Sequence, residues 1–223
     1  MKREVKALML GLAVVGLANW VNAAPTLTIS NGANPLITVV DNGAGDLSSL
    51  TGVVAVVTNV GVWNLIIDVG ETKPALGSIT NPVMDLAIQA SSTAAATLTL
   101  TFSDNGFALT NGVLSASLSG HIVSGAGETV GYFVYDDPGN VVGNTITQVT
   151  GIGPGPLPIS TTTIPETFAL AAPYSLTQVV DISTDGPSSN SIDASFQLLI
   201  PEPSTIALVG LGLVGALAIR RRK

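Results

Sequence analysis

The sequence has 223 residues, of which only 10% are charged and none is cysteine, so disulfides and thiol chemistry are excluded. Seven of the eight basic residues lie in the first six or the last four positions, which leaves Lys73 as the one basic residue between positions 24 and 200. With thirteen acidic residues, this central segment has a net charge of −12, which disfavours binding to nucleic acid.

Residues 1–23 have the pattern of a secretion signal peptide with a short apolar helix. A basic start precedes an apolar run from Ala7 to Ala18, and Val21-Asn22-Ala23 fits the small-residue rule for signal peptidase cleavage. Cleavage after Ala23 makes Ala24 the first mature residue, whereas cleavage after Ala24 would place Pro25 first, which peptidases handle poorly. The alternative is a retained membrane helix, although the run is short of the roughly 20 residues that span a bilayer.

Residues 24–200 form the predicted ectodomain, and their dominant period is two. Apolar residues alternate with Ser and Thr around Leu98–Phe102, around Leu114–Leu118 and around Ile192–Leu198, as in strands with one buried face. Trp63–Val69 is more continuous, as in a strand buried on both faces. Turn signals separate the strands: Asn31-Gly32, Asn42-Gly43, Asn59 to Gly61, Asp104-Asn105-Gly106, Asn111-Gly112, Pro138-Gly139-Asn140 and Asp185-Gly186-Pro187.

The pattern predicts an all-β fold, an antiparallel β-sandwich, with a short β-solenoid as the alternative. Gly151–Pro158 carries no strand pattern and is interpreted as a loop or hinge that could set off returning edge strands. Because 174–184 and 192–200 are expected to pair back into the same sheet, we predict one domain over 24–200.

The sequence contains few candidate catalytic residues. His121 is the only histidine, and the alternation places it on the polar face of a strand, as a surface residue. A glycosidase would need paired carboxylates, for which Asp136 with Asp137 or Asp41 with Asp46 are the candidates, but turn chemistry explains both pairs better. The sequence therefore predicts that the protein is not an enzyme. No cofactor is expected; calcium, held by Asp41–Asp46 or Asp136–Asn140, stays open.

The segment 201–223 is the most specific part of the sequence. Pro201-Glu202-Pro203 holds the chain extended, Ile206–Ile219 is a charge-free run of 14 residues, and a basic cluster follows. As a helix the run measures about 21 Å, short for a permanent anchor and suited to a transient one. The cluster, which positive-inside physics keeps on the cytoplasmic side, is Arg220, Arg221, Arg222 and Lys223.

This arrangement resembles the PEP-CTERM sorting signal, and residues 98–107 and 174–180 resemble a recurring group of ectodomains that carry it. The resemblance implies a Gram-negative host, recognition of the Pro-Glu-Pro motif by exosortase, and passage through the inner membrane to the cell surface or an extracellular matrix. A plain membrane tail anchor without processing is the alternative.

We therefore expect an exported surface protein with a structural or adhesive role, of the kind found in a biofilm matrix. The alternative is a carbohydrate-binding module for the host exopolysaccharide, which would need a platform of aromatic residues. Core packing is the preferred explanation of the aromatics, and Phe133 and Tyr135 are predicted to share one face of their strand. The candidates are Trp63, Tyr132, Phe133, Tyr135 and Tyr174.

Overall fold

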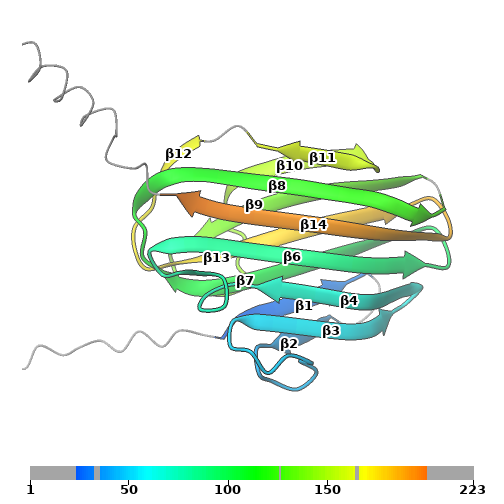
Figure 1. Ribbon diagram of the computed structural model, residues 1–223, viewed down its shortest axis with the longest axis horizontal. Helices are drawn as coiled ribbons and strands as arrows, with labels where there is room; N and C mark the ends of the chain where they lie inside the picture. The colour runs from blue at the N-terminus through cyan, green and yellow to red at the C-terminus, as the bar shows by residue number, and fades with distance from the viewer. Residues whose placement is uncertain (1–23, 33–35, 126, 164–165, 200–223) are drawn as a thin grey trace, which may run out of the picture.

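The computed structural model describes residues 24–32, 36–125, 127–163 and 166–199, which form two stacked antiparallel sheets (Figure 1). The predicted all-β antiparallel sandwich is confirmed, and the β-solenoid is wrong. Both predicted terminal helices lie outside the described residues. Within the described part all regular elements are strands, and it contains no helix long and apolar enough to cross a membrane.

Sheet A has six strands in the order β10-β9-β13-β7-β1-β2. Its strands are β1 (Thr26–Ser30), β2 (Ile37–Val40), β7 (Ala96–Phe107), β9 (Glu128–Asp137), β10 (Thr147–Pro156) and β13 (Tyr174–Thr184). Sheet B follows the order β11-β8-β14-β6-β4-β3, with β12 paired to β8 and β5 to β6. Its strands are β3 (Val53–Val60), β4 (Trp63–Glu71), β5 (Gly77–Ser78), β6 (Asn81–Ser92), β8 (Asn111–Ser124), β11 (Ile159–Thr162), β12 (Glu166–Ala169) and β14 (Ser188–Leu199).

The core lies between the sheets and follows the predicted alternation. In β7, Leu98, Leu100 and Phe102 are fully buried, while the threonines between them face outward. Burying each such side chain contributes about 1.5–3 kcal/mol. The buried Trp63 satisfies its indole by donating from Nε1 to the Thr97 carbonyl at 2.9 Å, which ties sheet B to sheet A.

The last two strands lie in the middle of the sandwich. β13 is hydrogen-bonded between β9 and β7, and β14 between β8 and β6. The expectation that 174–184 and 192–200 pair into the same sheet is therefore wrong, because β13 belongs to sheet A and β14 to sheet B. Neither is an edge strand set off by Gly151–Pro158. Alternation alone does not say which partners a strand takes, because pairing depends on the whole set of strands.

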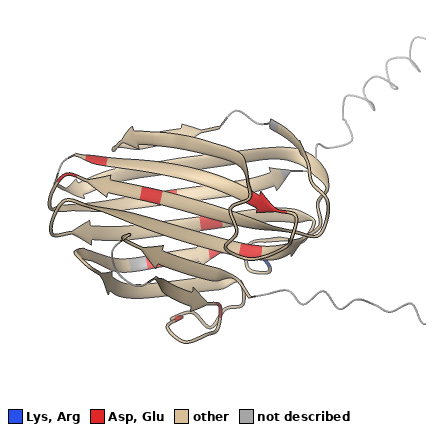
Figure 2. Cartoon of the chain, turned by 180° about the vertical axis from the view of Figure 1, so that it is seen from behind, with Lys and Arg blue, Asp and Glu red and all other residues tan. Residues whose placement is uncertain are grey.

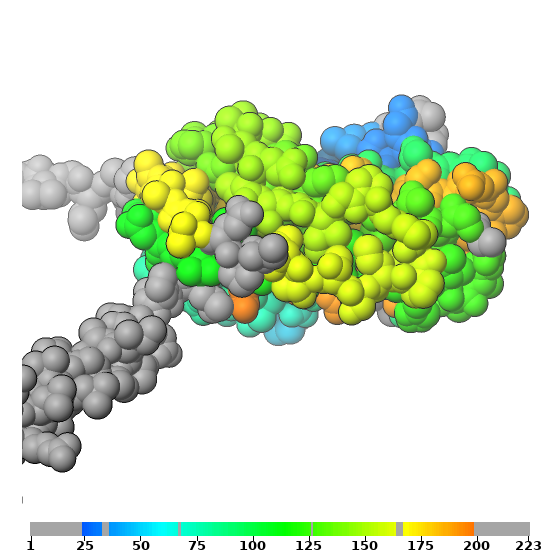
Figure 3. Space-filling model, turned by 90° about the horizontal axis from the view of Figure 1, so that it is seen from above, coloured from blue at the N-terminus to red at the C-terminus, as the bar shows by residue number. Residues whose placement is uncertain are grey.

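Gly151–Pro158 was expected to be a loop, but its first six residues belong to β10. This strand pairs only with β9 and is interrupted by two register shifts, between Gln148 and Thr150 and between Ile152 and Gly155. An edge strand tolerates prolines because one row of its amides needs no partner. Figure 3, seen from above, shows the segment from β10 to β12 running across the side of the sandwich where it forms the edge strands of both sheets.

Three further expectations are wrong. Trp63–Val69 is not buried on both faces: Trp63 and Leu65 are buried, whereas Ile66 is 45% exposed. Asp104-Asn105-Gly106 lies inside β7, and Asn111-Gly112 opens β8, so neither is a turn. The predicted turns at Asn42 and Asn140 are confirmed, since both residues have positive φ angles, 56° and 59°.

Candidate functional site

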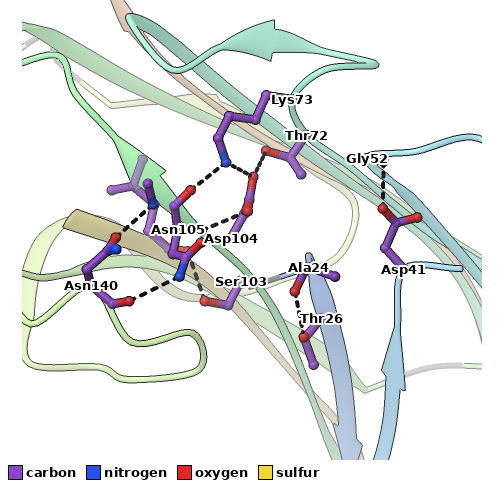
Figure 4. A network of polar contacts seen from close by, with 12 residues as sticks. Ala24, Thr26, Asp41, Gly52, Thr72, Lys73, Ser103, Asp104, Asn105 and Asn140 are labelled. Carbon is purple, nitrogen blue, oxygen red and sulfur yellow. Dashed lines mark hydrogen bonds and ion pairs between the residues drawn. The ribbon is translucent and has the colours of Figure 1, made fainter. Parts of the chain in front are cut away.

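A cavity of about 520 Å³ lies at the end of the sandwich where β1 begins. Ala24 and Pro25 line it together with three charged side chains, Asp41, Lys73 and Asp104. Figure 4 shows how these groups converge from the start of β1, the end of β2, the segment after β4 and the end of β7.

A buried ion pair holds one wall of this cavity. Lys73 Nζ lies 2.6 Å from Asp104 Oδ2, and the side chains are only 11% and 1% exposed. The ammonium also donates to the Asn105 carbonyl and lies 4.3 Å from the centre of the Phe107 ring. Burial raises the pKa of Asp104, and the Lys73 ammonium and hydrogen bonds to the carboxylate oppose that rise. Two of the three ammonium donors of Lys73 are thus used within the fold.

The same segment of β7 holds the loop that follows β9. Asn140 accepts from the Gly106 amide at 2.7 Å through its side chain, and its backbone carbonyl accepts from Asn105 Nδ2 at 3.1 Å. Asp104-Asn105-Gly106, which were expected to form a turn, therefore bind the segment after β4 and the loop after β9 to β7. Sequence reasoning missed this site; its one signal was that Lys73 is the only basic residue of the ectodomain.

In the first calcium candidate, Asp41–Asp46, the carboxylates accept hydrogen bonds from backbone amides. Asp46 accepts from the amides of Asn42, Ser48 and Ala55 at 2.8–2.9 Å, and Asp41 accepts from the Gly52 amide at 2.9 Å. These carboxylates organise the loop between β2 and β3. Across the described residues, no three or more His, Asp or Glu side chains are grouped as metal ligands.

The second candidate pair, Asp136 with Asp137, lies at the end of β9. Asp136 and Asp137 point to opposite faces of β9, because successive side chains alternate along a strand, and both are buried. Burial, the largest influence, raises the pKa of Asp136. For Asp137 burial acts in the same direction, but hydrogen bonds from Asn144 and from the Gly139 and Val141 amides outweigh it and lower the pKa. The two carboxylates do not face one substrate.

A carboxylate group that the sequence analysis missed lies on the outer face of sheet B. Asp85 pairs across strands with Glu71, and Asp193 lies on the neighbouring β14. Burial, then the charges of Asp193 and Glu71, raise the pKa of Asp85 to about 6. His121 is exposed on the same sheet, in register with Ser191, as predicted for a surface histidine. Figure 2 shows the acidic residues scattered over the molecule.

The aromatic candidates divide as predicted. Trp63, Tyr132 and Tyr174 are core residues, at most 1% exposed. Phe133 and Tyr135 both lie on the outer face of sheet A and are half-buried. They are neighbours two residues apart on β9, opposite Val179 and Thr177 of β13, and form the one aromatic pair on an outer face among the described residues.

The end of the chain matches a known family. Residues 199–223 match the model of the PEP-CTERM protein-sorting motif. The chain carries a PEP-CTERM sorting motif. This motif implies processing by exosortase and export to the cell surface. Pro201, Glu202, Pro203, Arg220, Arg221, Arg222 and Lys223 lie outside the described residues, as does Ala23, and their predicted roles stay predictions.

No curated protein matches the chain. Among solved structures, that of TmCBM61 in complex with β-1,4-galactotriose is 11% identical, with a TM-score of 0.34, covering 60% of this chain and 86% of that one. A structure of promiscuous carbohydrate-binding modules from the β-sandwich superfamily is 12% identical, with a TM-score of 0.29 and coverage of 78% and 83%. That of infectious bursal disease virus, Gt strain, is 16% identical, with a TM-score of 0.21 and coverage of 82% and 63%.

Proposed function

We propose that this PEP-CTERM protein is a structural or adhesive component of the bacterial surface or extracellular matrix. The observation that carries the proposal is the sorting motif at residues 199–223. The ectodomain supports a structural role because its charged groups are used to hold loops: Lys73 with Asp104, and Asp46 with three amides. Such an acidic sandwich is suited to a hydrated matrix.

The same reasoning supports a non-enzymatic role. The carboxylate pairs that could act in hydrolysis are separated or already bonded, and His121 stands on a strand facing solvent. Glu71, Asp85 and Asp193 gather on the broad outer face of sheet B. Removing water from a reacting bond requires an enclosed site, and an open sheet face gives little exclusion of water.

Intact mass spectrometry of protein purified from the native host tests the sorting proposal, with wild type beside Glu202→Ala. A mature mass that lacks residues 1–23 and the C-terminal segment, together with loss of C-terminal processing in Glu202→Ala, is the expected result. A wild-type mass that still contains Arg220 to Lys223 would mean an unprocessed membrane anchor and would overturn the role of exosortase.

A second candidate function is binding of the host exopolysaccharide, favoured by the adjacent Phe133 and Tyr135 on the outer face of sheet A. Aromatic side chains on a sheet face offer a stacking surface for sugar rings. If this face binds, Tyr135→Ala should weaken retention on host polysaccharide in affinity electrophoresis about tenfold. The matched control is Val40→Ala on β2, which is 39% exposed at the other edge of sheet A. Equal retention of wild type and both variants would remove this function.

A further inference from the structure

The first and last described strands begin and end at the same end of the sandwich, on the left of Figure 1. Thr26 of β1 is in register with Ser103 near the end of β7, and Leu199 of β14 with Val113 near the start of β8. Residues 108–110 join β7 to β8 directly, so both positions lie at this end. We call it the tether end.

Little chain separates the tether end from the apolar segment of the sorting signal. Pro201 lies two positions after Leu199, and Ile206 lies seven positions after Leu199. Even fully extended, seven residues span only about 25 Å. The interfacial layer of a bilayer is roughly 5–7 Å deep on each side of the hydrocarbon. While Ile206–Ile219 is in the membrane, the tether end must therefore lie close to the lipid surface.

Three loops at the tether end are long, at residues 41–52, 72–80 and 138–146, and two shorter connections lie beside them at 108–110 and 170–173. The connections at the opposite end, 31–36, 61–62, 93–95, 125–127 and 185–187, have six residues at most. Five large apolar side chains in the tether-end loops are substantially exposed without a partner to cover them. They are Leu47 at 67%, Leu50 at 65%, Ile79 at 48%, Val141 at 50% and Ile146 at 64%.

The same loops contain few ionisable side chains, and each of these is buried or bonded within the fold. They contain three ionisable side chains: Asp41 is 8% exposed, Asp46 is bonded to backbone amides, and Lys73 is paired with Asp104. The exposed acids Asp181 and Asp193 lie on strands instead. An acidic ectodomain is repelled by anionic lipid, but none of the three ionisable side chains in these loops is fully exposed.

We propose that the tether end is a membrane-contact surface, and that its apolar loop tips rest in the bilayer interface while the sorting signal is still attached. The inference rests on the proposed function, because the sorting signal provides the tether. Apolar tips on loops whose few charged side chains are already paired or hydrogen-bonded are favoured at the interface, where burial of the tips lowers the free energy. The contact would hold Pro201–Pro203 at the membrane surface, where a membrane-embedded processing enzyme works.

The chain contains no cysteine, so single cysteines can be labelled with a fluorophore without removing native ones. Leu47→Cys and Ile146→Cys report on the tether end, while Leu36→Cys and Val123→Cys, exposed by 60% and 63%, are the matched controls at the other end. The full chain is reconstituted into vesicles of phosphatidylethanolamine and phosphatidylglycerol containing brominated lipid. We expect the lipid quencher to reduce tether-end emission at least twofold and to leave the controls unchanged.

Equal quenching at both ends, or none at Leu47 and Ile146, would overturn the contact. Labels protected only after the processing enzyme is added would assign the loops to that enzyme instead. Flotation of the unlabelled full chain with the vesicles separates the two proposals. If the chain does not float, both the tether and the contact fail, whereas flotation with unquenched tether-end labels refutes the contact alone.

Discussion

A buried carboxylate, Asp68, should make the stability of the sandwich depend on pH. The side chain is fully buried; Oδ1 accepts from the Gln89 amide at 3.2 Å, and Oδ2 has no partner in the described part of the chain. Burial raises the pKa of Asp68 from 3.8 to about 7, against the opposing hydrogen bond from Gln89. We expect Asp68→Asn to remove most of this dependence.

The sign and magnitude follow from proton linkage. Because the folded protein binds the proton of Asp68 more tightly than the unfolded chain, stability is greatest below pH 3.8 and is lost as the pH rises to about 7. The whole shift is worth ~4 kcal/mol, of which ~3 kcal/mol falls between about pH 5 and about pH 8. Asn carries no charge, so at about pH 5 the free energy of unfolding of Asp68→Asn should nearly equal that of the wild type. At about pH 8 the variant should be more stable than the wild type by ~3 kcal/mol.

Denaturant unfolding of the mature protein at the two pH values, followed by the fluorescence of buried Trp63, measures the difference. Asp185→Asn, in an exposed turn, is the control and should follow the wild type at both pH values. If Asp68→Asn shows the wild-type pH slope, Asp68 is not the titrating group and the assigned burial penalty is wrong.

Three other substitutions test the packing. Lys73→Met leaves Asp104 buried without its cation and should lower the free energy of unfolding by ~3–5 kcal/mol in denaturant. Adding Asp104→Asn should recover part of that loss. If the losses of the two single variants simply add in the double variant, the pairing is contradicted. Gly70→Ala would place a Cβ 2.6 Å from the Phe102 ring and should cost about 1–3 kcal/mol, less when Phe102 is Leu; an unchanged midpoint refutes this. Tyr174→Phe removes a buried 2.9 Å hydrogen bond to a backbone carbonyl and should cost about 1–2 kcal/mol by the same assay, with no loss if the bond is unimportant.

Alternation in the sequence was enough to predict which side chains face the core. Leu98, Leu100 and Phe102 are buried because period two puts them on one face of β7, whatever strands lie beside it. The same reasoning placed Phe133 and Tyr135 together on the outer face. These features are local, so a single strand contains all the information they require.

The polar site could not be predicted in this way. Asp104-Asn105-Gly106 has a strong local turn signal, but contacts with Lys73 and Asn140, more than 30 residues away in each direction, hold it in a strand. These long-range contacts outweigh the local preference. No pattern near Asp104 specifies its cation, although a lone lysine in an acidic ectodomain is a hint that it is paired.

The strand order links folding to sorting. β13 and β14 are the last strands made, yet each fills the centre of its sheet, so before β14 is added the facing edges of β6 and β8 stay unpaired. The sandwich is therefore complete only when the chain has been exported as far as Leu199. The Pro-Glu-Pro motif begins two residues later, so during export the strand that closes sheet B and the motif would emerge almost together. Cleavage at the motif would preserve every paired strand, whereas a cut only a few residues upstream would remove part of a central one.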